Sequence, residues 1–474
     1  MPVTPFTYHF GFHTLALGYR WLTGLSSSDA ILVLGQVLNG LAPLGVYVLA
    51  LLATRRPWVG LGAAAIVGLI SLFPGYYVSW GRYTQLSGLI ILGPLLGLLI
   101  ANTEWSNGTD RQRDWAWIAS LSILAAGLVY VHYRVVAFAV TFLVAAIIVN
   151  KRFVWRIWLP AGVGTLLLAG PWLWRLLEVW ILPKLTDPST YLAPGNYNDF
   201  PWQYFNGWLE RSWWAMAFVG VVIGVIRRER AIWLVAAWTA LTAALLNIPG
   251  AGSWVVNNNS WAISAFLPGS VAAGYALEQV GSLAAWLWRY PPAQVIRPID
   301  RARRGLGLVV GLLSTVAMAA GLILGFEAQT RILNPRTVLA FPADRQAMTW
   351  LRQNLPSDAM IVVNSWYWQD GIWSASDGGI WIWTETGRPT TTPPADYYFD
   401  PAWTQQINDW NARWSVVQDL NSPEAAALLR EVGATHLYLG ALPGRVTPEM
   451  VAAAPERFHA IFDRDGVKVY EITP

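Results

Sequence analysis

Cysteine is absent from this sequence, and charged residues are scarce. None of the 474 residues is Cys, which excludes a disulfide framework and any Cys-ligated metal site. Charged residues make up 13% of the chain, against about 25% in soluble globular proteins, and hydrophobic residues make up 55%. The mean hydropathy of +0.38 agrees with these proportions. The composition therefore indicates a membrane protein.

Ten apolar segments occupy the first two-thirds of the chain. Each is close to the length that a helix needs to cross about 30 Å of hydrocarbon. Many are flanked by Trp and Tyr, whose amphipathic rings favour the depth of the lipid head groups. We predict a polytopic helical bundle of about ten spans. The segments are 29–54, 58–80, 83–102, 115–133, 135–150, 157–180, 213–226, 231–249, 260–288 and 305–326.

The cations in the loops between these segments are distributed unequally. One alternating set of loops carries fifteen Lys and Arg residues, whereas the other set, with the amino-terminal stretch, carries six. Because cations stay on the cytoplasmic side, we predict that the richer set is inside and that both termini are outside. The net charge of +4 arises from this asymmetry, and no basic stripe indicates a nucleic-acid partner. The richer set is Arg55, Arg56, Arg111, Arg113, Lys151, Arg152, Arg156, Arg227, Arg228, Arg230, Arg289, Arg297, Arg301, Arg303 and Arg304.

The amino-terminal stretch 1–27 conflicts with this topology. It contains no signal peptide, because it lacks a basic n-region and polar residues interrupt its apolar run. It is too polar to span, so we expect an amphipathic segment along the outer interface, the end of an outer loop. We also expect an upstream helix, encoded before Met1 or supplied by another membrane subunit. The transmembrane domain then covers 28–330, and a second domain covers 331–474.

The second domain alternates between helical and strand patterns. This alternation indicates a small α/β domain, which the charge pattern places on the extracytoplasmic side. The stretch 364–420 has no clean period, and we interpret it as long loops with short strands. The expected elements are helices from Pro342 and from Ser422, strands at 361–363 and 436–439, and a hairpin with a type I′ turn at Asp465-Gly466.

Polar residues that could bind a ligand cluster in three loops that the charge pattern places outside. An Arg at the end of a span next to aromatic residues suits a phosphate or pyrophosphate, which its planar donor fork binds bidentately. Each residue also has a simpler interpretation: an Arg can extend to lipid phosphates, a His can be a hydrogen-bonded interfacial residue, and an Asn can stabilise a turn. The candidates are Arg82, Tyr83, Gln85, His132, Tyr133, Arg134, Asn257 and Asn258.

Several segments resemble the bacterial GT-C class of membrane glycosyltransferases. The likeness covers nearly the whole chain. It is carried by Tyr8-His-Phe-Gly-Phe-His13, by Trp80-Gly-Arg-Tyr-Thr-Gln85, by Ala343-Asp-Arg-Gln-Ala-Met-Thr-Trp-Leu351 and by Asp377-Gly-Gly with Gly387-Arg388 downstream. Proteins of this class take a sugar from a polyprenyl-phosphate donor and transfer it at the outer face of the bacterial inner membrane. The resemblance thus implies a membrane lipid and a lipid-linked donor as partners.

The resemblance also implies roles for particular residues. Arg82 and Arg134 would lie near the donor phosphate. In this class, cations or a divalent metal stabilise the phosphate as it departs. Trp366, Trp368, Asp370, Asp377 and Trp381 would lie on the acceptor side, and the alternative is that this Trp-rich domain packs on the membrane surface. In this class an acidic residue of the first outer loop acts in catalysis, and that loop would precede Met1. Within the chain Asp29, Asp370 and Asp377 are the catalytic candidates, although Asp29 also fits a helix N-cap.

Two other functions stay open on the sequence alone. A non-catalytic scaffold or accessory membrane subunit could share the same fold. A transporter would carry charges and broken helices near the membrane midplane, whereas the predicted spans are nearly free of ionisable residues.

Overall fold

The computed structural model describes residues 8–105, 111–151, 153–182, 186, 198–248, 256–288, 298–369 and 371–473. The chain forms two compact units. The first, which we call the helical unit, contains Tyr8–Gly18 and Leu32–Leu333. The second, which we call the sheet unit, contains Tyr19–Ile31 and Asn334–Pro474. The segment before residue 32 therefore contributes to both units.

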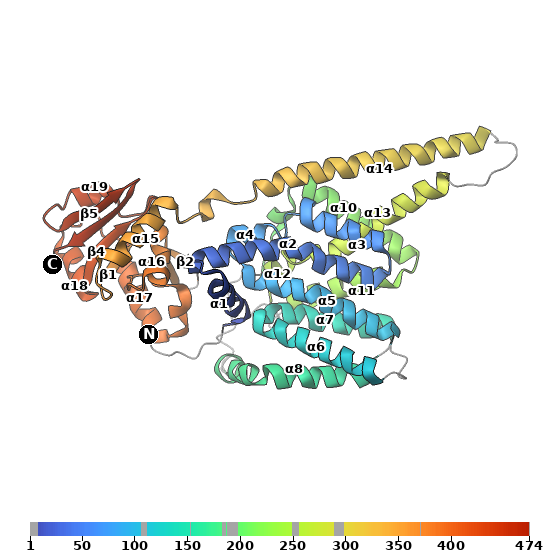
Figure 1. Cartoon of the computed structure of the whole chain (residues 1–474), viewed down its shortest axis with the longest axis horizontal. Helices are drawn as coiled ribbons and strands as arrows, with labels where there is room; N and C mark the ends of the chain where they lie inside the picture. Colours follow the sequence, from blue (N-terminus) through green and yellow to red (C-terminus); the bar gives the residue numbers. More distant parts are fainter. Residues whose placement is uncertain are drawn as a thin grey trace. The chain divides into compact units, whose positions relative to one another are not determined.

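The helical unit is a bundle of apolar helices (Figure 1). Among the described residues, 8 helices are long and apolar enough to cross a membrane, which confirms the prediction of a polytopic bundle. Its helices are α1 (Gly11–Thr23), α2 (Ser27–Thr54), α3 (Pro57–Ala65), α4 (Tyr76–Trp80), α5 (Tyr83–Trp105), α6 (Arg111–Val131), α7 (Tyr133–Asn150), α8 (Trp155–Leu176), α10 (Trp208–Ile226), α11 (Arg230–Asn247), α12 (Asn258–Ala262), α13 (Phe266–Trp288) and α14 (Pro298–Thr330), with the π-helices η1 (Ile66–Ile70) and η2 (Leu177–Ile181) and the 3₁₀ helix η4 (Trp202–Phe205).

Two of the predicted segments are interrupted rather than continuous. In the segment 58–80, α3 passes into the π-helix η1, and Ser71 then leaves the helical conformation before α4 begins. The backbone groups freed by this break are satisfied by other helices: Gln329 Nε2 donates to the Ser71 carbonyl at 2.6 Å, and the Leu72 amide donates to Glu210. The segment 260–288 is divided into α12 and α13. Such breaks are tolerated in a bundle only where neighbouring groups replace the lost hydrogen bonds.

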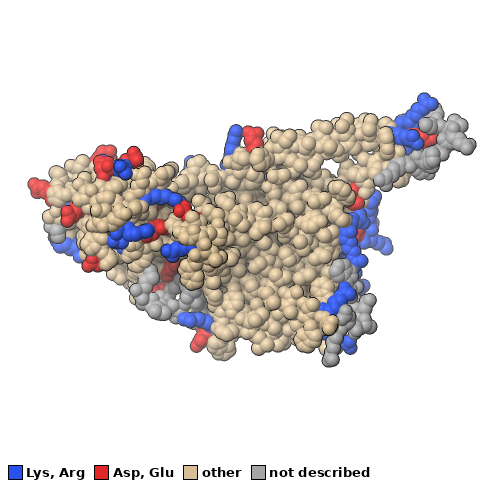
Figure 2. Space-filling model, viewed as in Figure 1, with Lys and Arg blue, Asp and Glu red and all other residues tan. Residues whose placement is uncertain are grey.

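Most Lys and Arg side chains of the helical unit gather at one end of the bundle, on the right of Figure 2. We call this the basic end. There Arg56 donates to Glu229 at 2.9 Å and to Glu278 at 3.0 Å, so it joins the beginning of α3 to α11 and α13. The clustering agrees with the charge pattern of the sequence. The side of the membrane that each end faces stays a prediction.

The sheet unit is an α/β fold, as predicted. Its main sheet has the order β1-β4-β6-β5, in which β1 and β4 are parallel and the other pairs are antiparallel. A second sheet pairs β2 with β3. The strands are β1 (Met360–Val363), β2 (Ser365–Gln369), β3 (Ile372–Ala375), β4 (Ala434–Leu439), β5 (Phe458–Arg464) and β6 (Val467–Ile472). The helices are α15 (Pro342–Asn354), α16 (Ile382–Thr386), α17 (Pro401–Trp414), α18 (Pro423–Glu431) and α19 (Pro448–Ala452), with 3₁₀ turns η5 (Pro335–Thr337), η6 (Gly378–Trp381) and η7 (Ala395–Phe399).

Helices cover both faces of the main sheet. Alternate residues of β1 point to opposite faces: Val362 packs with α17 and α18, whereas Ile361 and Val363 pack with α15. The predicted hairpin is present, with both Asp465 and Gly466 at positive φ, as a type I′ turn requires. The interpretation of 364–420 as loops and short strands missed α17. That helix is capped by Asp400 and begins at Pro401. Its buried residues, Ile407, Trp410, Asn411 and Trp414, follow a helical spacing that is hard to recognise in the sequence because one of them is polar.

Candidate functional site

Three segments far apart in the sequence meet at the end of the helical unit opposite the basic end. These segments, 71–83, 131–134 and 257–264, define what we call the aromatic end. The Tyr77 hydroxyl donates to the Ile263 carbonyl at 3.2 Å, and Gln85 Nε2 donates to Ser264 Oγ at 3.2 Å. The ring of Trp261 lies 5.1 Å from that of Phe138 on α7. The loops that the sequence singled out are therefore neighbours in space.

Arg82 stands at the junction of α4 and α5. Gly81 ends α4 in the left-handed conformation, with φ +63°, and turns the chain so that Arg82 lies beside the Trp80 ring, 4.9 Å from its centroid. Within the described part of the chain, the partly exposed guanidinium makes no hydrogen bond or ion pair. Tyr83 begins α5 and is buried, with its ring 5.6 Å from Phe12. Arg82 therefore stays a candidate for binding a phosphate.

His132, Tyr133 and Arg134 lie where α6 passes into α7. His132 is the extended residue that precedes α7, and its ring packs 4.5 Å from that of His9. The Arg134 guanidinium lies 6.0 Å from the Tyr133 ring. Electrostatic effects of both Arg82 and Arg134 reach His132, so the two arginines share one neighbourhood. The sequence analysis did not choose His9 as a site residue, although it lies in the Tyr8–His13 motif.

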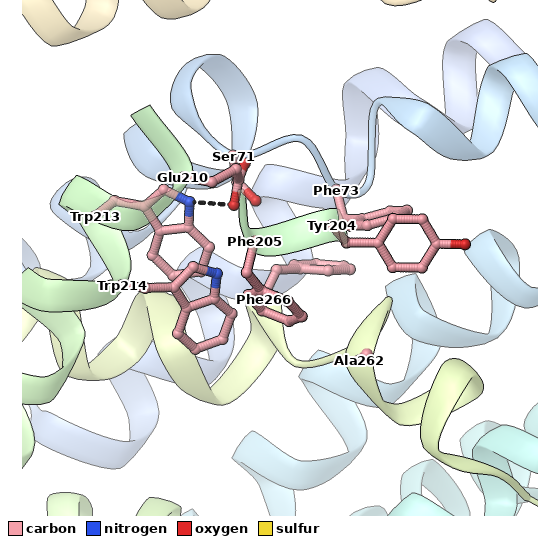
Figure 3. A pocket seen from close by; sticks show the side chains of 9 residues that line it. All are labelled: Ser71, Phe73, Tyr204, Phe205, Glu210, Trp213, Trp214, Ala262 and Phe266. Carbon is pink, nitrogen blue, oxygen red and sulfur yellow. Dashed lines mark hydrogen bonds between the residues drawn. The ribbon is translucent and has the colours of Figure 1, made fainter. Parts of the chain in front are cut away.

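A small cavity in the helical unit is lined mostly by aromatic rings (Figure 3). Its volume of about 10 Å³ is sufficient for a single water molecule. Tyr204 belongs to the wall and contacts both Phe73 and Trp80, at 5.3 and 5.6 Å between ring centroids. Glu210, the acidic residue of the wall, accepts hydrogen bonds from the Leu72 amide and, at 2.8 Å, from Trp213 Nε1.

Glu210 was missed by the sequence analysis. Its signal was an acidic residue in the first turn of a span, between Trp208 and Trp213. The carboxylate stabilises the break after η1, because it accepts the Leu72 amide that the helix no longer pairs. We therefore assign it a structural role.

Three other predicted site residues are engaged inside the fold. Gln85 is buried and bonds to Ser264. The Asn257 side chain caps α12 by accepting the Ser260 amide at 2.8 Å. Asn258 forms a network with Asn198 and Asn247, at 2.7 to 3.2 Å. We leave these three amides out of the ligand site that we propose below.

The remaining candidates belong to the sheet unit. Trp366 and Trp368 lie on β2, two residues apart on the same face, and are 47% and 46% exposed. Asp377 is fully buried and accepts the amides of Gly379 and Gly440, so it does not face an acceptor. Asp370 lies outside the described residues.

Asp29 has a partner in the same unit. It sits at the third position of α2, and the N-cap is Ser26, whose hydroxyl accepts the Asp29 amide at 3.2 Å. The expectation that Asp29 itself is the cap is therefore wrong. Its carboxylate forms an ion pair with Arg345. No group of three or more His, Cys, Asp or Glu residues that could hold a metal ion occurs among the described residues.

Comparisons with known proteins give matches at the level of structure. No family model and no curated protein matches the sequence. ArnT from Cupriavidus metallidurans in the apo state has a TM-score of 0.56 and 16% identity, over 96% of this chain and 86% of that chain. ArnT bound to undecaprenyl phosphate has the same TM-score, with 15% identity over 99% and 87% of the two chains.

An archaeal enzyme shares the same architecture. The oligosaccharyltransferase of Archaeoglobus fulgidus, tethered to an acceptor peptide, has a TM-score of 0.56 and 12% identity, over 92% of this chain and 61% of that chain. ArnT and this oligosaccharyltransferase are both GT-C glycosyltransferases. At such low identity the likeness concerns the fold alone. The chain is a multi-pass membrane protein with the fold of the GT-C glycosyltransferases.

Proposed function

We propose that the aromatic end binds the phosphate of a polyprenyl-phosphate sugar donor, and that the protein transfers this sugar to an acceptor at the outer face of the membrane. The observation that carries the proposal is the position of Arg82 and Arg134, two cations in one aromatic neighbourhood at the end of a GT-C bundle. Two similar structures support this proposal, since one is bound to undecaprenyl phosphate and the other is tethered to an acceptor peptide.

The chemistry that this site could support is a displacement at the anomeric carbon. The acceptor oxygen forms a bond to that carbon while the bond to the phosphate oxygen breaks. Guanidinium groups stabilise the phosphate that departs, because they donate charge-assisted hydrogen bonds to it. The rings of Trp80 and Tyr133 lie beside the two arginines and could provide surfaces for a sugar or a prenyl chain. We expect the sheet unit to supply the acceptor site, where Trp366 and Trp368 expose their rings.

A second candidate function is a non-catalytic scaffold with the same fold. It is favoured by the state of the carboxylates that the sequence proposed as catalytic. Asp29 is paired with Arg345, and Asp377 is buried in the sheet unit. A scaffold of this kind would still bind the lipid phosphate but would show no transfer, so binding and turnover must be measured separately.

Binding is tested with arginine variants of the full chain. Each lost charge-assisted contact weakens binding by about 1.5–3 kcal/mol, so Arg82→Ala or Arg134→Ala should each lower affinity for a polyprenyl phosphate by roughly tenfold or more. Arg228→Ala, an exposed cation at the basic end, is the matched control and should bind normally. If the double variant at positions 82 and 134 binds as tightly as the unaltered chain, the two arginines only contact bulk lipid head groups.

A further inference from the structure

The imidazoles of His9 and His132 form a buried pair at the aromatic end. Their ring centroids are 4.5 Å apart, and the two residues are 3% and 6% exposed. Both ring nitrogens of His9 and Nδ1 of His132 are buried without a hydrogen-bond partner. Buried polar atoms in proteins nearly always have a partner. Three such atoms in one place are therefore candidates for hydrogen bonds to a bound group.

The pair is held in position by close packing on both sides. Phe10 packs against Tyr130 of α6, at 5.2 Å between ring centroids. A Cβ atom on Gly11 would lie 2.9 Å from the Val131 side chain, so only glycine allows this approach. On the other side, a Cβ atom on Gly88 of α5 would lie 3.2 Å from Cβ of His132. Close packing therefore fixes where the backbone holds the two histidines.

Several charged and titratable groups surround the two rings: His13 from α1, Arg82 from the α4–α5 junction, Tyr133 and Arg134 from α7, and Tyr8 stacked on His9. Burial, with the charges of His13 and Arg134, lowers the pKa of His9 to about 3. Burial, together with His9 and the two arginines, holds the pKa of His132 well below its usual value. Both imidazoles are neutral at physiological pH in the absence of a ligand.

The reaction of the proposed function changes the charge at this place. The donor is a phosphodiester with one negative charge. When the bond between the anomeric carbon and the phosphate oxygen breaks, its electron pair stays on that oxygen and leaves a phosphomonoester with two negative charges. The acceptor hydroxyl loses one proton as its oxygen bonds to the anomeric carbon. Transfer thus produces one added negative charge on the phosphate and one proton.

We propose that the His9–His132 pair takes up this proton and holds it beside the departing phosphate. The inference rests on the proposed function and names the form of the lipid that the site prefers, the phosphomonoester. Bound next to Arg82 and Arg134, the two negative charges offset both the cost of burying a protonated imidazole and the repulsion from the neighbouring cations. A protonated imidazole then donates an N–H to the phosphate, which stabilises the leaving group.

The sign of the proton exchange distinguishes this role from simple binding by arginine. A phosphomonoester has its second pKa near 6, so at pH about 7.5 it is already almost fully charged. Arginines alone would bind it with no uptake of protons, or with slight release. Uptake approaching one proton per bound phosphomonoester requires a group on the protein that becomes protonated. A phosphodiester, with its single charge, should bind with little uptake.

The experiment is titration calorimetry on the full chain in detergent, with a polyprenyl phosphate and its methyl ester as ligands. The measurement is repeated in two buffers of different ionisation enthalpy, which yields the number of protons exchanged. We expect uptake for the phosphate only. His9→Gln and His132→Gln keep hydrogen-bonding groups but cannot titrate, so uptake should be lost, and the preference for the phosphate over the ester should fall roughly tenfold, the equivalent of one pKa unit. His459→Gln, an exposed site in the sheet unit, should leave both unchanged.

Two results would overturn the inference. The first is binding of both ligands by the unaltered chain with no proton uptake, which leaves the arginine site intact and removes only the histidine role. The second is uptake that persists in the double histidine variant, which would place the proton elsewhere. Failure of the unaltered chain to bind either ligand would instead refute the proposed function itself, and the inference with it. The measurements on the unaltered chain do not depend on how the variants fold.

Discussion

Among single residues, two buried carboxyl groups join separate segments of the sheet unit through hydrogen bonds. Asp344 and Asp377 are both fully buried. Asp344 accepts hydrogen bonds from the Phe341 amide and the Tyr438 hydroxyl, and Asp377 accepts the Gly440 amide at 3.0 Å. Their oxygens thus hold the chain after β4 against the start of α15. This use of Asp377 replaces the acceptor contact that the family resemblance implies.

Asp377 should make the stability of the sheet unit depend on pH. Burial, with the neighbouring charge of Asp344, raises the pKa of Asp377 from 3.8 to about 7. The folded protein favours the protonated form of Asp377, so this residue contributes to the free energy of unfolding. The contribution is fully present below about pH 3.8 and is lost as pH rises through about 7, by about 1.4 kcal/mol per pKa unit. We expect the melting temperature, followed by Trp fluorescence, to fall over this window.

Asp377→Asn should flatten this pH profile. The amide cannot accept a hydrogen bond at both of its ends, so we also expect a loss of about 1–3 kcal/mol at every pH. Asp463→Asn is the matched control, since Asp463 is an exposed carboxylate paired with Lys468 on the neighbouring strand. A variant at position 377 whose melting temperature still varies with pH as in the unaltered chain would contradict the assignment.

At the scale of elements, glycines set how closely the apolar helices approach. A Cβ atom on Gly93 of α5 would lie 2.3 Å from the Gly45 carbonyl oxygen of α2. On α10, a Cβ atom at Gly220 would lie 2.0 Å from the Ala272 carbonyl oxygen of α13. In lipid, helices associate largely through such close packing, because the hydrophobic effect does not distinguish a neighbouring helix from a lipid tail.

Gly93→Ala should therefore separate α2 from α5. We expect a loss of about 1–3 kcal/mol, the usual result of an added methyl group in a filled contact, seen as a lower melting temperature in detergent. Gly170→Ala on α8 is the control, because no atom lies within 4 Å of its added Cβ. That change should be neutral or slightly stabilising, since Ala favours a helix more than Gly does. Equal melting temperatures for the two variants would mean that this crossing is not a tight contact.

At the scale of the whole molecule, the topology can be tested directly because the chain has no cysteine. Single cysteines can be placed at the exposed positions Gln203, Ala460 and Arg228. From the distribution of cations, we expect an impermeant thiol reagent to label positions 203 and 460 on intact cells and to leave position 228 unlabelled. Labelling of 228 together with protection of 203 would invert the topology and move the proposed site to the cytoplasmic side.

The class of this protein could be predicted from its sequence without a structure. Long apolar segments and few charges follow from the absence of water in the bilayer, so they could be interpreted without any tertiary contact. The unequal number of cations in alternate loops is likewise a feature of the sequence alone. The same holds for the hairpin at Asp465-Gly466, where the turn is a local property of the backbone. The sequence also singled out the loops around Arg82 and His132 as candidates for a site, since ionisable residues near a bilayer are costly.

Which of the candidate residues are engaged inside the bundle could be seen only in the folded chain. Gln85, Asn257 and Asn258 were candidates on the same grounds as Arg82, because all lie in loops predicted to be outside. Their side chains nevertheless form hydrogen bonds inside the bundle. His9 lies 123 positions before its partner, and no local pattern indicates that the two imidazoles meet. The physical reason is that hydrogen-bond satisfaction and burial depend on which helices become neighbours, a property that composition and periodicity do not contain.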